Sequence, residues 1–211
     1  AICEGYIDSI NITLDDWSVL DGTLYKGQKL IDILNMKAGD QKFIGEKKFN
    51  SDVRINDKRF LNVNTFPIKD VMEFPILQES KKQRAVYNYN GLATNLIMNY
   101  TIFKTGDDWE KLLNKIFNKH IRVKDSVWFA QTVKYHNSSI HSKETGRYSF
   151  YANRYDYLRI AKGILDDWNN DTCIGKYLKT IYEQRINKNK KSYNGDRYGQ
   201  FSVSQYTKKY G

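Results

Sequence analysis

Apolar residues recur every three to four positions through much of residues 79–187, and this spacing matches the turn of an α-helix. Ser80 is of a residue type favoured at helix N-caps, and the stripe after it predicts a first helix. The apolar members of this stripe are Ala85, Val86, Tyr89, Leu92, Ala93, Leu96, Ile97 and Tyr100. Because an amphipathic helix buries such a stripe, residues 79–187 are predicted to form a helical body.

The same spacing predicts further helices along this body. Thr105 can cap a helix whose first turn is acidic, which suits the helix dipole, and whose core face comprises Trp109, Leu112, Leu113, Ile116 and Phe117. Asp125 is predicted to open a shorter helix that bears Trp128, Phe129, Thr132 and Val133.

Polar residues 137–147 predict a loop before the last two helices. The first of these is predicted to bury Tyr151, Tyr155, Leu158, Ala161, Leu165 and Trp168. Asp171 or Thr172 is predicted to cap the second, whose face comprises Ile174, Tyr177, Leu178, Ile181 and Tyr182.

Residues 1–78 show the two-residue period of β-strands instead. From Tyr6 to Leu14, apolar side chains fall on one face of an extended chain. Short apolar-rich runs at 30–34 and 42–49 flank a turn signal, and 53–63 has the pattern of a hairpin. Pro67 and Pro75 bracket a last extended stretch that suits an edge strand or a connection. This segment is predicted to be a small, largely antiparallel sheet.

Charge separates a third segment from the other two. Residues 188–211 hold 6 basic side chains and 1 acidic side chain. Their excess of positive charge is half of the net charge of +10 that the chain carries. They carry no helical stripe, and glycines and aromatic residues interrupt them. The expected fold is therefore α+β, with a small N-terminal antiparallel β region (1–78), a helical body (79–187) that forms one compact unit with it, and an extended basic C-terminal arm (188–211).

The arm is the first candidate functional site. Tyrosine and phenylalanine offer large contact areas with few rotatable bonds, and lysine and arginine can contact carboxylates or phosphates. The partner-binding residues are predicted to be Lys188, Lys190, Lys191, Tyr193, Arg197, Tyr198, Phe201, Tyr206, Lys208, Lys209 and Tyr210. A tail that folds back on its own domain is the alternative interpretation.

A short pattern in the N-terminal segment suggests catalysis as an alternative. Asp32, Glu46 and Lys48 flank a Gly-Asp turn, and Glu46 and Lys48 would point to the same side of a strand. These residues resemble the motif of PD-(D/E)xK nucleases. The resemblance implies two carboxylates that share a divalent cation, with a lysine near the attacking water. An exposed charged hairpin explains the same residues without catalysis.

Other reactive residues carry weaker signals. His136, His141 and Glu144 share one polar loop, which could hold a metal or a general acid, but they lack the paired histidines of a metalloprotease helix. The aromatic residues of 148–157 could stack on bases, although core packing is the preferred interpretation for Tyr151 and Tyr155. Tyr148 and Tyr157 are expected to remain available at the surface.

Several classes of protein are excluded or disfavoured by composition. Two cysteines, Cys3 and Cys173, are too few for a disulfide scaffold or a four-cysteine zinc site, and both are expected to be ordinary thiols. No glycine-rich phosphate-binding motif occurs. No signal peptide or transmembrane segment is visible. No cofactor and no metal are therefore expected.

The favoured function is a non-enzymatic structural or assembly subunit of a large multi-chain complex. The counts of 20 Ile, 19 Asn, 25 Lys and 16 Tyr against 9 Arg and 2 Pro suggest AT-rich codons. A phage virion component, such as a connector, ring or minor capsid protein, is therefore the specific hypothesis, located in the virion or host cytoplasm. Expected partners are other protein subunits, with nonspecific DNA or RNA contact possible and no membrane. The alternatives are the metal-dependent nuclease and a sequence-independent nucleic-acid-binding module.

Overall fold

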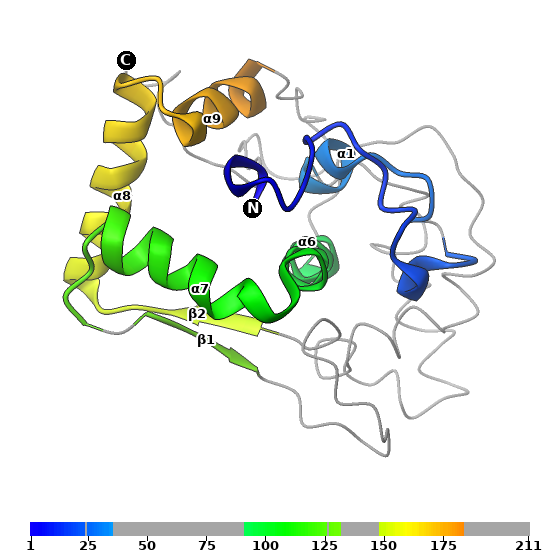
Figure 1. The fold of residues 1–211 in the computed structure, drawn as a ribbon, viewed down its shortest axis with the longest axis horizontal. Coiled ribbons are helices and arrows are strands. Elements are labelled where there is room, and N and C mark those ends of the chain that lie inside the picture. The colour runs from blue at the N-terminus through cyan, green and yellow to red at the C-terminus, as the bar shows by residue number, and fades with distance from the viewer. Residues whose placement is uncertain (24, 36–90, 126, 132–147, 184–211) are drawn as a thin grey trace, which may run out of the picture.

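The computed structural model describes residues 1–23, 25–35, 91–125, 127–131 and 148–183, and in this part the fold is α+β. The described elements include helices α6 (Gly91–Thr105), α7 (Trp109–Leu113), α8 (Arg154–Asn169) and α9 (Cys173–Glu183) and one antiparallel strand pair, β1 (Trp128–Gln131) and β2 (Tyr148–Tyr151). Figure 1 shows α8 running across the far end of the helical run that begins with α7, with the hairpin beside this run. The α+β class is therefore confirmed for the described residues, whereas the predicted N-terminal β region and extended basic arm are not supported.

The strand predicted over Tyr6–Leu14 is wrong. Residues 1–35, where described, contain two 3₁₀ turns, η1 (Ile2–Glu4) and η2 (Ser18–Leu20), and the short helix α1 (Leu30–Leu34), which replaces the extended run expected at 30–34. A single antiparallel bridge joins Thr13 to Lys29. The buried side chains explain the difference, because they recur at three- and four-residue intervals rather than at every second residue: Ile7, Ile10, Leu14, Trp17 and Leu20.

This N-terminal segment packs on α6. The Trp17 ring lies 6.1 Å from the rings of both Tyr100 and Phe103. The Tyr100 hydroxyl donates to Asp16 at 2.9 Å, and Lys104 donates to the other oxygen of Asp16 at 2.7 Å. Burial and this hydrogen bond raise the pKa of Tyr100, so its hydroxyl remains a donor at neutral pH. Two chain segments far apart in sequence are thereby joined in one core.

A nearly continuous helical run follows α6. Gly106, at φ 52°, begins a 3₁₀ turn, η4 (Gly106–Asp108), and after α7 a wider π-helical stretch, η5 (Asn114–His120), completes the run. Thr105 does not cap the next helix as predicted, because its hydroxyl donates to carbonyl groups of α6. Trp109 and Leu112 are buried as predicted.

The hairpin stands where the sequence predicted a helix opened by Asp125. Trp128 pairs with Tyr151 and Phe129 pairs with Phe150 across the two strands. The alternation of a strand sends neighbouring side chains to opposite faces, so one face carries the two phenylalanines and the other carries Trp128 and Tyr151. The phenylalanine face packs on the helices: Phe129 lies 5.7 Å from Trp109 between ring centroids. These tertiary contacts account for the extended conformation.

Helices α8 and α9 close the described fold. Thr172 caps α9 as predicted, since its hydroxyl accepts the Gly175 N–H at 3.1 Å. Ile181 of α9 packs against Ile10 and Ile31 of the N-terminal segment, and Figure 1 shows α9 on the same side of the fold as that segment. Helix α9 therefore contacts the N-terminal segment.

A disulfide bond joins Cys3 to Cys173, and their Cα atoms are 5.8 Å apart. The expectation of ordinary thiols is therefore wrong. The two residues are 170 positions apart in sequence, so no local spacing motif could signal the bond. It connects the η1 turn to the first residue of α9.

Several further expectations lie outside the described residues. These are the runs at 42–49 and 53–63, the stretch between Pro67 and Pro75, and the basic arm. The start of the first helix at Ser80 and the loop at 137–147 also fall there.

Candidate interaction surface

The buried face of α8 is unusually polar. Asp156 is fully buried, and it accepts the backbone N–H groups of Lys124 and Asp125, both at 3.0 Å. Arg159 donates to the same carboxylate at 2.6 Å, and Asn153 donates at 2.9 Å while accepting the Asp156 N–H as helix N-cap. Donors from the protein itself therefore satisfy both oxygens of the Asp156 carboxylate, as a buried charged group requires. This network fixes the start of α8 against the chain that leads into β1.

Asp167 repeats this role three turns further along the same face. It is 2% exposed, and its carboxylate oxygens lie 2.9 and 3.0 Å from His120 Nε2. Thr172 donates to it at 2.7 Å. Asp167 therefore ties η5, α8 and the start of α9 together.

With polar groups turned inward, α8 turns apolar groups outward. Tyr155, Leu158 and Leu165 are 58, 67 and 57% exposed, and Tyr157 is 47% exposed. The prediction that Tyr155, Leu158, Ala161 and Leu165 form a buried stripe is therefore wrong. The 3.6-residue period was correct, but the face that packs on the protein is the one that carries Asp156 and Asp167.

The outer face of the hairpin carries two further exposed rings. Trp128 and Tyr151 are 52 and 45% exposed, and their rings stack at 5.6 Å with an interplanar angle of 14°. Tyr151 was also expected in the core, and this expectation is wrong too. Nearby, the Arg154 guanidinium lies 5.1 Å from the centroid of the Tyr155 ring. We call the following residues the hairpin–α8 surface: Trp128, Tyr151, Tyr155, Leu158 and Leu165. Tyr157 lies on another side of α8, with its ring 5.6 Å from that of Phe150.

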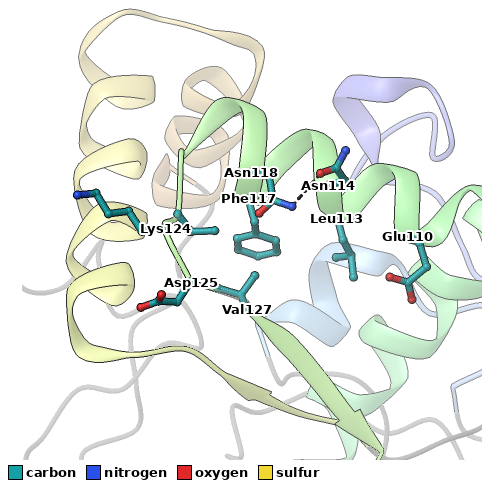
Figure 2. Close-up of a pocket in the computed structure, with 9 residues that line it drawn as sticks. Glu110, Leu113, Asn114, Phe117, Asn118, Lys124, Asp125 and Val127 are labelled. Carbon is teal, nitrogen blue, oxygen red and sulfur yellow. Dashed lines mark hydrogen bonds between the residues drawn. The ribbon is translucent and has the colours of Figure 1, made fainter.

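A groove of about 450 Å³ lies on another side of the hairpin, between α7, η5 and the chain leading to β1. Figure 2 shows Phe117 in the middle of this groove, with Glu110 and Asp125 at opposite ends. Asp125 also accepts a hydrogen bond from Asn153, so it takes part in the network around the start of α8. The two carboxylates are therefore not arranged to share one cation.

The structure brings together few of the residues that the sequence singled out. Asp32 lies half-buried in α1, in a helix rather than in the strand expected there. Glu46 and Lys48, the loop residues His136, His141 and Glu144, and all the partner-binding residues of the arm lie outside the described residues. Tyr148 is half-buried in β2, whereas Tyr157 is exposed as expected.

The described residues were also compared with the requirements of a metal site and of a membrane-spanning helix. Within the described ranges, no group of three or more His, Cys, Asp or Glu side chains could hold a metal ion. None of the described helices has the length and apolar character needed to cross a bilayer.

No family model matches the chain, and no curated protein and no solved structure matches it.

Sequence reasoning missed Asp156 and Asp167 as anchors. Eleven residues correspond to slightly more than three full turns of a helix, so two aspartates at this separation share one face. Asn153 followed three residues later by Asp156 also has the pattern of an N-terminal capping box. The aspartate spacing and the capping pattern favour one face of this helix as the packed one, whereas the leucines favour the opposite face. The sequence therefore does not decide which face is buried.

We expect the stability of this protein to fall in acid partly through Asp156. Burial raises the pKa of Asp156, but the hydrogen bonds from Lys124, Arg159 and Asp125 outweigh burial, so the pKa is below its ordinary value. The stabilisation is therefore complete above pH ~4, near the unfolded pKa. It is lost as the pH falls through the lower, folded pKa.

Urea unfolding between pH 2 and 7 measures this dependence. Asp156→Asn should be less stable at pH 7 and should lose less stability on acidification than the wild-type protein. Asp107→Asn, which replaces an exposed carboxylate, is the control and should follow the wild type. An unchanged acid slope in Asp156→Asn would show that the carboxylate does not stabilise the fold in this way.

Proposed function

We propose that this chain is a non-enzymatic subunit of a multi-chain assembly and that it docks on neighbouring subunits through the hairpin–α8 surface. The observation that carries this proposal is the exposure of five large apolar side chains, Trp128 and Tyr151 on the hairpin and Tyr155, Leu158 and Leu165 on the adjoining helix. The packed face of the same helix is occupied by hydrogen-bonded aspartates, so the apolar face has no role in the core of the described fold.

The extent of the surface supports a protein partner. Aromatic side chains have about 150–250 Å² each to bury, and the exposed fractions of Trp128, Tyr151 and Tyr155 range from 45 to 58%. These three side chains alone then expose about 300 Å², before the two leucines are added. Monomeric proteins rarely expose contiguous apolar patches above a few hundred Å² without a binding role. Aromatic residues are also enriched where subunits meet.

The disulfide bears on where such an assembly works. Disulfides persist in extracellular environments and on virion or cell surfaces, and they are rare in the reducing cytosol. The Cys3–Cys173 bond therefore favours the virion over the host cytoplasm as the location. A connector, ring or minor capsid protein of a phage is the specific assembly that we propose, with the arm at 188–211 as a second contact.

A photo-crosslinking experiment tests the docking role. The photoreactive residue p-benzoylphenylalanine replaces Tyr155 in the full chain, which is produced in the cells that naturally contain the protein. Irradiation should yield covalent adducts with one defined polypeptide of a particle much heavier than the 24.8 kDa chain. The same probe at Lys176, an exposed position of α9, is the matched control and should yield few adducts.

Two results would contradict this function. One is a protein that stays at monomer mass in those cells and gives no more adduct from position 155 than from position 176. The other is a magnesium-dependent cleavage of DNA by the purified chain that Glu46→Gln abolishes, since this would favour the nuclease alternative.

A further inference from the structure

The exposed residues of α8 follow the spacing of a coiled coil. Positions 155, 158, 162, 165 and 169 are separated alternately by three and four residues, which is the a/d pattern of a seven-residue repeat. We call these residues the α8 stripe: Tyr155, Leu158, Lys162, Leu165 and Asn169. All five are exposed. Such a stripe is suited to packing against another helix rather than against a loop or a flat sheet.

We propose that the α8 stripe packs against the α8 stripe of a second copy of this chain, with the two helices antiparallel. This inference rests on the proposed function and names the first partner of the hairpin–α8 surface. A twofold axis makes one patch contact itself, so a dimer needs a self-complementary patch. The α8 stripe has that property, as the pairing of its individual positions indicates.

Antiparallel pairing places unlike members of the stripe opposite one another. With the axis near Ile160, Tyr155 faces Leu165 of the second copy, and Leu158 faces Lys162 of the second copy. The aliphatic stem of Lys162 can then cover Leu158 while its ammonium group keeps its ion pair with Asp166. Ala161, small and exposed beside the axis, allows close approach of the two helices.

Charge argues against the parallel alternative. A parallel pair in register would place each Lys162 directly against Lys162 of the other copy, and like charges in contact are unfavourable. It would also align the two helix dipoles, whereas an antiparallel pair opposes them. The same stripe therefore fits a second copy well in only one of the two orientations.

The exposed area of the α8 stripe determines the affinity that we expect for the dimer. Tyr155, Leu158 and Leu165 are exposed by 58, 67 and 57% of their surfaces, and one helix face is smaller than the ~800 Å² that each partner contributes to a standard interface. We therefore expect a reversible dimer with a Kd on the order of micromolar, the range in which modest interfaces bind.

Sedimentation equilibrium of the purified full chain between about 1 and 200 µM tests the pairing, a range chosen to bracket the expected Kd. The mass should rise from that of the 24.8 kDa chain toward twice that value. Leu158→Glu with Leu165→Glu should weaken the dimer at least tenfold. The matched control introduces two glutamates at exposed positions of the N-terminal segment, Asn11→Glu and Ser18→Glu, and should dimerise like the wild type. Circular dichroism and thermal melting should show that both variants are folded.

Cysteine crosslinking tests the orientation. A chain with Tyr155→Cys mixed with a chain with Leu165→Cys should form a disulfide-linked dimer under mild oxidation, since the two positions face each other. Either chain alone should form much less, because ten helical residues separate the two copies of each position by about 15 Å. Crosslinking of Tyr155→Cys with itself would show parallel helices and overturn the proposed arrangement.

The outcomes separate this inference from the function on which it rests. A chain that stays monomeric to the highest concentration, or a dimer that the double glutamate variant leaves intact, overturns the self-pairing. If position 155 nevertheless crosslinks to a different polypeptide in the natural assembly, the assembly role stands. A stable dimer that never enters a larger particle would support the pairing and overturn the assembly role.

Discussion

Loss of the Cys3–Cys173 bond is expected to lower the melting temperature of this protein by roughly 10–20 °C. The bond closes a loop across 170 residues, and in the chain-entropy description a cross-link of that length restricts the unfolded state by about 5 kcal/mol. For a chain of this size, 1 kcal/mol corresponds to about 2–4 °C. The bond also joins two segments that pack together, since Ile2 and Tyr177 lie against the cluster of Ile10, Ile31 and Ile181.

Thermal melting of the wild type with and without reductant, beside Cys3→Ser with Cys173→Ser, measures this effect. The reduced wild type and the double variant should melt at similar temperatures, both well below the oxidised protein. Thiol titration in denaturant provides the control, and it should find no free thiol before reduction and two afterwards. Two free thiols in the untreated protein would contradict the pairing.

Gly175→Ala should destabilise the protein by about 3 kcal/mol, the upper part of the range for overpacked sites. A Cβ atom at Gly175 would lie 1.9 Å from the backbone oxygen of Asp167 and 2.6 Å from its carbonyl carbon. Neither atom can move without shifting α8 itself, so α8 and α9 would have to separate. That separation would also disturb the Thr172 hydroxyl contact with Asp167.

Gly163→Ala is the matched control for this prediction. Its new Cβ would also be crowded, at 2.2 Å, but the neighbour is the terminal methyl group of Ile121, which can rotate away. Both substitutions gain the same helix propensity of roughly 1 kcal/mol, so the difference in unfolding free energy isolates the backbone clash. Equal stability of the two variants would show that α8 and α9 are not packed through Gly175.

Local chemistry predicted the helices well. The apolar spacing anticipated the described part of α6, the acidic turn before α7, and α8 and α9 with Thr172 as a cap. Ala93, Leu96, Tyr100, Trp109 and Leu112 are buried as predicted. Such signals depend on neighbours within one helical turn, which is the range over which a sequence pattern is informative.

The N-terminal segment and the hairpin show where local patterns were insufficient. Ile10, Ile12 and Leu14 alternate like a strand, but Ile10 and Leu14 are buried while Ile12 is half-buried in a chain of turns. The sequence predicted Phe129 in a helix, but Phe129 lies in β1. The reason is that the rings of Phe117, Phe150 and Trp109 pack around its ring. In both cases, contacts with distant residues selected the conformation.

The sequence by itself determined the period of α8, the residues on each of its faces and the net positive charge of the chain. Only the tertiary structure decided which face of α8 is buried and that Cys3 meets Cys173. The reason is that a buried carboxylate is tolerated only when donors surround it. For Asp156 and Asp167, those donors come from Lys124, Asp125 and His120, which the folded chain brings from other elements. Because the aspartates find their donors inside the fold, the leucines and tyrosines of α8 face outward, and this is the face on which we propose that another chain docks.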